Sequence, residues 1–470
     1  MSQQRLSPTL FAGKRALVMG LGIHGGGLGV ARFLATHGAD VTVTDLRPAE
    51  QLAEPLAHLA GLPIRYVLGE HRVEDFTDTD LVVRNPAVPR ESPLLAAARA
   101  AGVVIEMEMS LFFRHCPAPI IGITGTKGKT TTTSLCAAML AAWREDTVVA
   151  GNMGISALEQ LDGIGPETPV VIELSSWQLE GLAEYGLSPH IALVTNLSPD
   201  HLNRYGTMAD YAEAKRGIVR WQRPGDVAIL NRDDALVRAF GTDTSAVVVH
   251  FGAQDGGDQG AWLAGERLHW RLDGREYAAP RAALRVPGEH NAINALAAGL
   301  AALAAGAPFA AVAAGLASFT GVRDRLESLG TVAGVEYIND TTATAPAAAA
   351  AALLAMTKPT VLIAGGSEKH TDFTEFAAVA ARVPKAIVLL RGDSLERLTR
   401  ALLDAGLHPA RLHSAAGSMD EAVGWARDLV APGEVVLLSP GCASFGMFRN
   451  EFHRGDMFRA AVAQLAREGR

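Results

Sequence analysis

Residues 119–135 read PIIGITGTKGKTTTTSL, and this stretch decides the class of fold. Its apolar start predicts a buried strand, and a glycine turn at 125–128 leads into Lys129, where we expect a helix to begin. A strand, a glycine turn, a Gly-Lys-Thr sequence and a helix, in that order, predict a loop that holds nucleotide phosphates. The common form of this loop has a glycine five residues before Gly128. This chain has Ile123 there, and we interpret the difference as a shorter loop.

The residues of this loop suit ATP and a metal ion. Successive backbone N–H groups can surround an anion, the Lys129 ammonium can neutralise terminal phosphates, and the Thr130 hydroxyl can bind Mg²⁺. The alternative is a turn rich in glycine and threonine that carries a surface lysine. The residues expected to contact ATP in the loop are Gly125, Thr126, Lys127, Gly128, Lys129, Thr130 and Thr131.

Length and composition fit an ordinary globular protein. The 470 residues suggest two to four domains, and 49% hydrophobic with 20% charged residues is typical of such domains. A net charge of −8 argues against nonspecific binding to nucleic acid or to an anionic membrane. We expect no membrane span, because no apolar run reaches about 18 residues. The cysteines Cys116, Cys136 and Cys442 lack metal-ligand spacing, which favours free thiols in the cytoplasm.

Strands alternate with helices along the whole chain and predict an α/β protein of three domains. We expect a Rossmann-like N-terminal domain over 1–114, a phosphate-loop ATPase domain with a mostly parallel sheet over 115–321, and a Rossmann-like C-terminal domain over 322–470. Hairpins are expected within 245–285, and helices at 290–306 and 343–356. The expected strands lie at 15–20, 40–45, 80–86, 119–125, 168–175, 190–198, 226–231, 336–340, 359–366, 385–390 and 434–440.

A second glycine motif follows the first expected strand. Gly20-x-Gly22-x-x-Gly25 opens a helix, and Asp45 ends the next strand 25 residues after Gly20. This pattern is typical of a turn whose backbone N–H groups hold a dinucleotide or another diphosphate. Asp45 with Arg47 could serve a ribose, a uracil or a phosphate. A tight turn that binds nothing is the alternative.

Polar residues at other strand ends are further candidates. Glu173 ends one strand and His201 follows another, and open α/β sheets bind ligands at that edge, so both are candidate metal ligands. Isolated residues of these types are usually structural or solvated. Asn291 and Asn294 begin an alanine-rich helix, where they could read a nucleobase, close a phosphate site or only cap the helix.

These motifs together resemble the Mur ligase family over the whole chain. The family loop is spelled G-T-x-G-K-T without the first glycine, as at 125–130. ELSSWQLE at 173–180 is nearly the ELSSFQLE of the D-glutamate-adding members. Further stretches follow in the family order, namely TNLSPDHLNRY, HNAIN, FTGVRDRLE, IND followed by ATAP, and SPGCAS at 439–444.

The resemblance implies a ligase whose three domains bind a UDP-sugar, ATP and an amino acid. ATP would phosphorylate the carboxylate of UDP-N-acetylmuramoyl-L-alanine, and the amine of D-glutamate would displace phosphate. The product is a peptidoglycan precursor, so the activity would serve cell-wall growth, cell shape and division. The implied cofactors are ATP and Mg²⁺ at two sites, and we expect a monomer. The first glycine motif would then hold a UDP diphosphate and not NAD.

The family's site residues are carried over where the motifs match. Lys129, Glu173, His201 and Lys215 would be catalytic, with Thr130, Glu173, His201 and Lys215 at the metals. Lys215 would act as a carbamate, because a bare ammonium would be repelled by Mg²⁺; without the resemblance it would be an ordinary surface lysine. The residues implied at the UDP-sugar are Gly22, Ile23, His24, Asp45, Leu46, Arg47, Asn85, Asn152, Ser175 and Gln178. Those implied at ATP beyond the loop are Asn291, Asn294, Arg325 and Asp340, and those at glutamate are Thr344, Lys369, Ser444 and Phe445.

One departure from the family pattern concerns the amino acid. D-glutamate-adding members carry Asp-Ser-Lys-Ala-Thr where this chain has DTTAT at 340–344, so Thr342 replaces a lysine and Arg449 could substitute for it. A branch that adds L-glutamate to the same UDP-sugar is therefore an alternative. A folylpolyglutamate synthase is a less favoured one, because about 118 residues precede the loop. A dehydrogenase would rest on Gly20–Gly25 alone, and a regulator without activity would need no Glu173.

Overall fold

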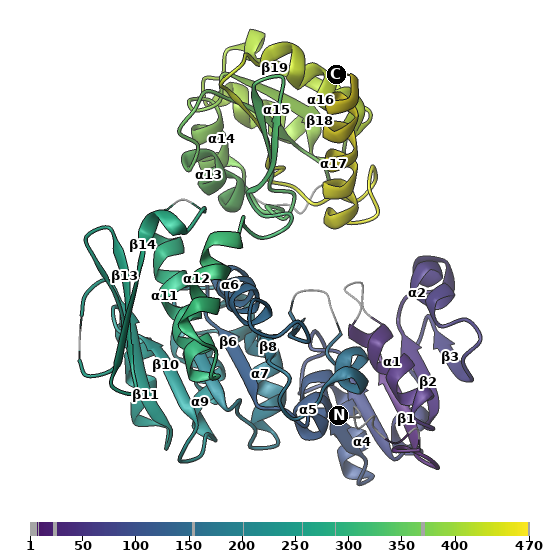
Figure 1. Ribbon diagram of the computed structural model, residues 1–470. Helices are drawn as coiled ribbons and strands as arrows, with labels where there is room; N and C mark the ends of the chain where they lie inside the picture. The colour runs from purple at the N-terminus through teal and green to yellow at the C-terminus, as the bar shows by residue number, and fades with distance from the viewer. Residues whose placement is uncertain are drawn as a thin grey trace. The chain divides into compact units, whose positions relative to one another are not determined.

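The computed structural model describes residues 7, 9–21, 26–152, 156–200, 202–255, 257–286, 288–367 and 372–468. Three sheets with flanking helices follow one another along the chain, in purple, teal and green to yellow in Figure 1. The chain divides into two compact units, residues 1–319 and 320–470, and each unit is described by itself. The first unit holds two sheets and the second holds one, which agrees with three α/β domains. The boundaries at 114 and 322 remain predictions.

The N-terminal sheet has five parallel strands in the order β3-β2-β1-β4-β5. The chain changes direction across the sheet between β1 and β4, which is where a ligand crevice forms in such folds. The strands are β1 (Arg15–Met19), β2 (Asp40–Asp45), β3 (Ile64–Leu68), β4 (Leu81–Arg84) and β5 (Val104–Glu106). The helices are α1 (Gly26–Thr36), η1 (Ala49–Leu52), α2 (Ala53–His58), α3 (Val73–Thr77), α4 (Pro93–Ala100) and α5 (Glu108–His115).

The central sheet has nine strands in the order β14-β13-β12-β11-β10-β9-β6-β8-β7. The strands from β7 to β12 pair in parallel, and an antiparallel meander of β12, β13 and β14 completes one end, where hairpins were expected. The strands are β6 (Ile120–Thr124), β7 (Val148–Gly151), β8 (Val170–Glu173), β9 (Ile191–Val194), β10 (Val227–Asn231), β11 (Val247–Gly252), β12 (Gly260–Ala264), β13 (Arg267–Leu272) and β14 (Arg275–Pro280). The helices are α6 (Lys129–Ala141), η2 (Leu158–Gly163), α7 (Ser176–Ala183), α8 (Leu202–Tyr205), α9 (Met208–Arg220), α10 (Ala235–Ala239), η3 (Phe240–Thr242), η4 (Arg281–Ala283), α11 (Glu289–Ala304) and α12 (Phe309–Ser318).

The sheet of the second unit has the order β15-β16-β20-β17-β18-β19, with β15 antiparallel and the other strands parallel. Its alanine-rich helix α13 begins at Pro346, as expected for a proline in a first helical turn. The strands are β15 (Glu327–Val332), β16 (Val335–Asn339), β17 (Thr360–Ala364), β18 (Ala386–Leu390), β19 (Leu412–Ala416) and β20 (Val435–Leu438). The helices are α13 (Pro346–Leu354), α14 (Thr374–Ala380), α15 (Leu395–Asp404), η5 (Pro409–Arg411), α16 (Met419–Leu429) and α17 (Glu451–Glu468).

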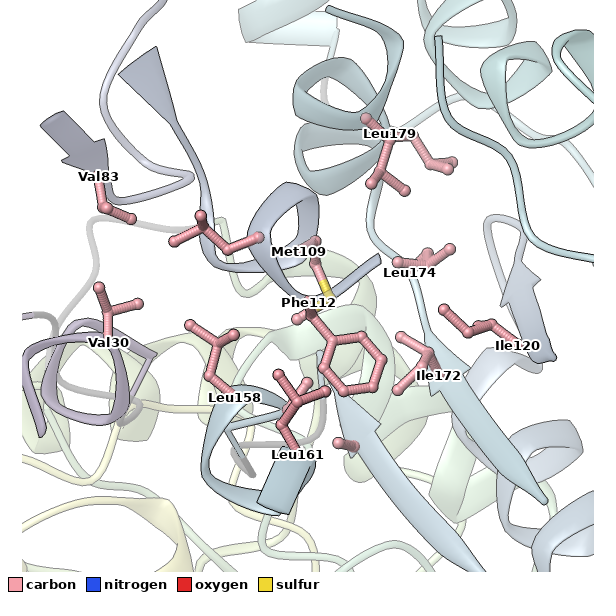
Figure 2. Packing of buried hydrophobic residues seen from close by; sticks show 14 of the residues in the cluster. Val30, Val83, Met109, Phe112, Ile120, Leu158, Leu161, Ile172, Leu174 and Leu179 are labelled. Atoms are coloured by element: carbon pink, nitrogen blue, oxygen red, sulfur yellow. The ribbon is translucent and has the colours of Figure 1, made fainter. Parts of the chain in front are cut away.

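A hydrophobic core runs from the N-terminal sheet into the central domain. Figure 2 shows Phe112 of α5 beside Leu158 and Leu161 of η2, with Ile172 of the central sheet on the other side. Phe112 is fully buried, so its replacement by alanine would cost about 3–5 kcal/mol. Helix α5 therefore packs the two domains of the first unit against each other.

Three neighbouring strands of the central sheet bring the candidate residues together. Strand β6 lies between β8 and β9, and all three run in the same direction. Their carboxyl ends therefore meet at one edge, with Ile123 directly opposite Glu173 in the register. Within the described ranges, no helix is long and apolar enough to cross a membrane. Cys116, Cys136 and Cys442 are not joined in disulfide bonds.

Candidate nucleotide and metal site

The loop at 125–128 connects β6 to α6, as the sequence predicts. Gly125 has φ +146° and Gly128 has φ +82°, backbone conformations that favour glycine. A Cβ atom on Gly125 would lie 1.9 Å from the Thr195 hydroxyl oxygen, so no other residue fits there. A Cβ atom on Gly128 would lie 2.6 Å from Asn294 Oδ1. The two glycines therefore permit close contact with β9 on one side and α11 on the other.

Two loop residues have their backbone N–H groups engaged. Thr126 N–H donates to Asn196 O at 2.8 Å, and Lys127 N–H donates to Asn196 Oδ1 at 2.9 Å. The Lys129 ammonium donates to the Thr126 carbonyl at 2.8 Å, so it lies folded over its own loop. The hydroxyl-bearing residues Thr130 and Thr131 follow in the first turn of α6.

Glu173 ends β8 beside the loop and is 1% exposed. Its Oε1 accepts a hydrogen bond from Asn152 Nδ2 at 2.9 Å. Its Oε2 is buried and has no hydrogen-bond partner among the described residues. A buried carboxylate oxygen without a partner is costly in free energy, and oxygen donors are the ligands that Mg²⁺ prefers. Glu173 therefore fits a metal ligand next to the phosphate loop.

Of the four metal ligands expected from the sequence, the structure describes Thr130, Glu173 and Lys215, and their role at a metal stays a prediction. No cluster of three His, Cys, Asp or Glu side chains occurs in the ranges that the structure describes. His201 lies outside those ranges. Thr130 lies in the first turn of α6, Glu173 ends β8, and Lys215 lies on α9, where the charges of Asp200 and Glu173 act on it.

Lys215 is buried, with 1% exposure, and is no surface lysine. Its ammonium donates to Thr124 Oγ1 at 3.2 Å and lies 5.0 Å from the centre of the Tyr211 ring. Burial, and then the charge of Lys129, lower the pKa of Lys215 to about 7. The amine is therefore neutral in a large fraction of molecules near neutral pH, and a neutral amine is the form that reacts with electrophiles such as CO₂.

Ser175 and Gln178, expected at the UDP-sugar, bond to each other at the start of α7. Gln178 N–H donates to Ser175 Oγ at 3.3 Å, and Ser175 N–H donates to Gln178 Oε1 at 2.9 Å. This reciprocal pair is a capping box, which satisfies N–H groups that a helix start leaves unpaired. The motif thus fixes α7 directly after Glu173.

The helix α11 brings Asn294 to the phosphate loop. Asn294 is 8% exposed and lies against Gly128, and its amide donates to Asn291 Oδ1 at 3.5 Å, a long hydrogen bond. Both residues are in the first two turns of the helix. The start of α11 therefore lies beside the phosphate loop, and contact of Asn291 and Asn294 with ATP stays a prediction.

In the N-terminal sheet, Asp45 lies at the end of β2 and forms an ion pair with Arg47. Arg47 donates through Nε and a terminal nitrogen to the two carboxylate oxygens, at 3.0 and 2.7 Å, and Leu21 N–H donates to Asp45 at 3.1 Å. Arg47 holds the pKa of Asp45 below its usual value although burial opposes this. Leu46 is 66% exposed beside this pair.

Asn85 closes a turn after β4, where its Oδ1 accepts from Ala87 N–H at 3.0 Å. Asn85 also lies next to Gly20, with 3.5 Å between its Cβ atom and a Cβ placed on that glycine. The remaining expected contacts of the first glycine motif, Gly22, Ile23 and His24, lie outside the described residues.

In the second unit, Asp340 follows β16 and is 5% exposed. It accepts hydrogen bonds from Ser439 Oγ at 2.7 Å and from Leu326 N–H at 3.1 Å. Burial raises the pKa of Asp340 to about 6. Arg325 is exposed in the same loop as Leu326.

Three of the residues expected at glutamate are described: Thr344 follows β16 in the chain, and Ser444 and Phe445 follow β20. Ser444 is 2% exposed, and its hydroxyl has no partner among the described residues, whereas Phe445 is 52% exposed. Thr344 N–H donates to Thr342 O at 2.8 Å. The Thr342 hydroxyl donates to Asp324 O at 2.8 Å, so it is held within its own loop. Lys369 lies outside the described residues.

Two contacts that position these loops were not expected from the sequence. Asn196 binds the phosphate loop, and the fully buried Arg454 of α17 binds the loops after β16 and β20. Arg454 donates to Thr341 and to the carbonyls of Cys442 and Ala443. The available signal for Asn196 was its place two residues after the end of β9, close to the sheet edge where Glu173 ends β8. No local pattern distinguished Arg454 from a surface arginine.

Comparison with known proteins gives consistent matches along the chain. Family models described as Mur ligase MurD-like, N-terminal domain; Mur ligase middle domain; and Mur ligase, glutamate ligase domain match residues 14–106, 123–302 and 324–442. A UDP-N-acetylmuramoylalanine–D-glutamate ligase from Roseiflexus sp. is 52% identical, over 96% of this chain and 98% of the relative. One of the same name from Symbiobacterium thermophilum is 42% identical, over 96% and 98% of the two chains.

Solved structures agree in fold. The crystal structure of a UDP-N-acetylmuramate-alanine ligase from Thermotoga maritima has a TM-score of 0.60 and 23% identity, and covers 96% of this chain and 99% of that one. A pseudomurein peptide ligase from Methanothermus fervidus has a TM-score of 0.53 and 18% identity, over 96% and 100% of the two chains. At these identities the likeness shows the fold alone.

Proposed function

The chain belongs to the Mur ligase family, and from this premise we propose that it joins D-glutamate to UDP-N-acetylmuramoyl-L-alanine in peptidoglycan precursor synthesis. ATP is split to ADP and phosphate, and one amide bond forms. The relatives named for this reaction share up to 52% of their residues with the chain over nearly its whole length. A ligase of this kind would work in the cytoplasm, as a monomer, on small molecules alone.

The proposed reaction has two steps. A carboxylate oxygen of the L-alanyl group attacks the γ-phosphorus of ATP, and ADP leaves with the electron pair of the broken bond. The glutamate amine then attacks the carbonyl carbon of the acyl phosphate. Phosphate leaves from the tetrahedral intermediate, and the amine loses a proton. Phosphorylation is required because a carboxylate is a poor electrophile, while phosphate is a good leaving group.

The observation that carries the proposal is the pairing of the phosphate loop with an unsatisfied Glu173 oxygen on the adjacent strand. Lys129 would leave the Thr126 carbonyl and neutralise phosphate oxygens as two anions approach each other. Thr130, Glu173, His201 and a carbamylated Lys215 would hold two Mg²⁺ ions, which supply further positive charge at the phosphates.

Carbamylation of Lys215 is part of the proposal because of where the amine lies. A buried ammonium beside Lys129 is disfavoured by both desolvation and like charge. Addition of CO₂ to the neutral amine would form a carbamate, release one proton, and replace a repelled cation by an anion. That anion would balance the positive charge of Lys129 and of a bound metal.

The UDP-sugar would bind at the N-terminal sheet and glutamate at the sheet of the second unit. Asp45, Leu46, Arg47 and Asn85 at the N-terminal sheet edge would hold the uridine diphosphate. Asn291, Asn294, Arg325 and Asp340 would contact ATP. In the second unit, the unpartnered Ser444 hydroxyl supports a polar ligand there, and Thr344, Lys369 and Phe445 would complete the glutamate site.

The experiment is a phosphate-release assay with UDP-N-acetylmuramoyl-L-alanine, ATP, Mg²⁺ and either D- or L-glutamate. We expect release that requires the UDP-sugar and is faster with D-glutamate. Faster release with L-glutamate would overturn the assignment of D-glutamate as the substrate. This comparison is needed because Thr342 replaces a lysine that D-glutamate-adding members carry. Release without the UDP-sugar would mean a plain ATPase, and no release with either enantiomer would overturn the proposed function.

A further inference from the structure

The segment 195–198, directly after β9, lies along the phosphate loop. The Thr195 hydroxyl donates to Lys127 O at 2.7 Å. Ser198 N–H donates to the Thr126 hydroxyl at 3.0 Å. Strand β9 is the neighbour of β6, so this segment and the loop leave the sheet side by side.

Asn196 makes the most complete of these contacts. Its Oδ1 accepts from Lys127 N–H, and its Nδ2 donates to Lys127 O, both at 2.9 Å. Its own carbonyl accepts from Thr126 N–H at 2.8 Å. The side-chain amide therefore pairs with both polar groups of one loop residue, as a neighbouring strand would.

This pairing decides which N–H groups of the loop remain for a ligand. The N–H groups of Thr126 and Lys127 are used by Asn196. For the N–H groups of Gly128, Thr130 and Thr131, the described part of the chain supplies no acceptor. The first N–H groups of a helix are unpaired and carry the positive end of its dipole, which favours anions.

We propose that Asn196 is a positioning residue for nucleotide binding, which fixes the turn at 126–127 so that phosphates meet the N–H groups from Gly128 onward. This inference rests on the proposed function, because it concerns the nucleotide of that reaction. The backbone N–H groups of Thr126 and Lys127 then maintain the shape of the loop and do not contact phosphate. The expected backbone contacts to phosphate are therefore limited to Gly128 and the residues after it.

The surroundings hold Asn196 in place from behind. Asn231 Nδ2 of β10 donates to Thr195 O at 2.7 Å, and Leu197 N–H donates to Asp234 Oδ2 at 2.6 Å. Gly125 is required because Thr195 fills the space that a Cβ atom would need. The support therefore extends from the loop through β9 to β10.

The test compares Asn196→Ala with Gln222→Ala for binding of Mg²⁺-ATP, measured by calorimetry on the full chain. Gln222 is a matched control, since it is a buried amide of the same domain. Its Nε2 donates to Pro189 O and Val227 O, at 3.1 and 2.9 Å, at the amino ends of the strands. Loss of two hydrogen bonds predicts a rise in Kd of roughly 30-fold for Asn196→Ala. Gln222→Ala should bind within about twofold of the wild type while losing thermal stability.

Hydrogen exchange of the phosphate loop distinguishes a local effect on the loop from a general loss of stability. The peptide covering 125–131 should exchange faster in Asn196→Ala than in the wild type and in Gln222→Ala. Should Asn196→Ala not fold, Asn196→Asp takes its place, because it keeps the acceptor for Lys127 N–H and loses only the donor. A Kd within twofold of the wild type for the folded variant would overturn the inference. A wild type that binds no Mg²⁺-ATP would instead overturn the proposed function itself.

Discussion

The replacement Arg454→Met tests how the second unit builds its substrate site. Arg454 is fully buried in α17, and within the described ranges it forms no ion pair with a carboxylate. Its guanidinium instead makes four hydrogen bonds, to Thr341 Oγ1 and O at 3.0 and 2.8 Å and to Cys442 O and Ala443 O at 3.2 Å each. The loops after β16 and β20 are thereby held together by one side chain.

The size of the effect follows from two opposing terms. Four hydrogen bonds from a charged donor, at about 1.5 kcal/mol each, contribute about 6 kcal/mol. Burial lowers the pKa of Arg454 from its usual 12.5 to about 10, which means that the buried charge costs about 3 kcal/mol. Methionine removes both terms, so the net loss of stability should be about 3 kcal/mol. For a unit of about 150 residues this corresponds to a fall in Tm of about 10 °C.

The assay is thermal unfolding followed by steady-state kinetics at a temperature where the variant is folded. The KM for glutamate should rise about tenfold or more, because the orientation of Ser444 depends on the loop that Arg454 holds, and the KM for the UDP-sugar should not change. Arg454→Lys should be no better than Arg454→Met, since it keeps the buried charge and loses the planar donor geometry. Arg427→Met is the control, because Arg427 is half exposed and forms an ion pair with its neighbour Asp428, a contact worth less than about 1 kcal/mol. Full rescue by lysine, or a Tm within 2 °C of the wild type for methionine, would refute this account.

The parts of the fold that could be predicted from the sequence are those with strong local signals. The stretch at 119–135 predicts a strand, a turn and a helix, and β6 and α6 confirm them. Pro346 marks the start of α13 because its fixed φ suits a first helical turn. The short strand β7 was missed, since four residues of an edge strand carry little periodicity.

Part of the candidate site could not be predicted because it depends on residues far apart in the chain. Asn196 and the phosphate loop are about 70 residues apart, and they meet only because β9 pairs with β6. Arg454 lies 113 residues after Thr341, in a helix whose sequence does not distinguish buried from exposed arginines. Ser175 is a different case. Its S-x-x-Q spacing to Gln178 is a capping-box signal in the sequence, but the family resemblance directed attention to a role at the UDP-sugar.

Three further predictions concern charged residues of the first unit. Lys129→Ala should abolish phosphate release with Tm unchanged within about 2 °C, because the side chain is half exposed and contributes little packing; near-normal turnover would contradict the phosphate-loop assignment. Lys215→Ala should lose activity severely and regain part of it with added formate or acetate, since the missing group is an anion; no recovery with any short carboxylate, together with an unmodified lysine by mass spectrometry, would count against the carbamate. Glu108→Gln should flatten the pH dependence of stability. Burial raises the pKa of Glu108 to about 7, while its carboxylate accepts from Ser156 Oγ at 2.6 Å and Ala157 N–H at 3.0 Å. A carboxyl whose folded pKa is raised stabilises the fold fully below its unfolded pKa of about 4.5, and that contribution is lost as the pH rises through 7. The difference is up to about 3 kcal/mol between pH 5 and pH 8. Between pH 5 and pH 8 the Tm of the wild type should therefore fall more than the Tm of Glu108→Gln. The glutamine keeps an acceptor oxygen and does not titrate. Every other titrating group is common to the two proteins, so parallel Tm curves would show that Glu108 is ionised throughout and that its burial does not raise its pKa.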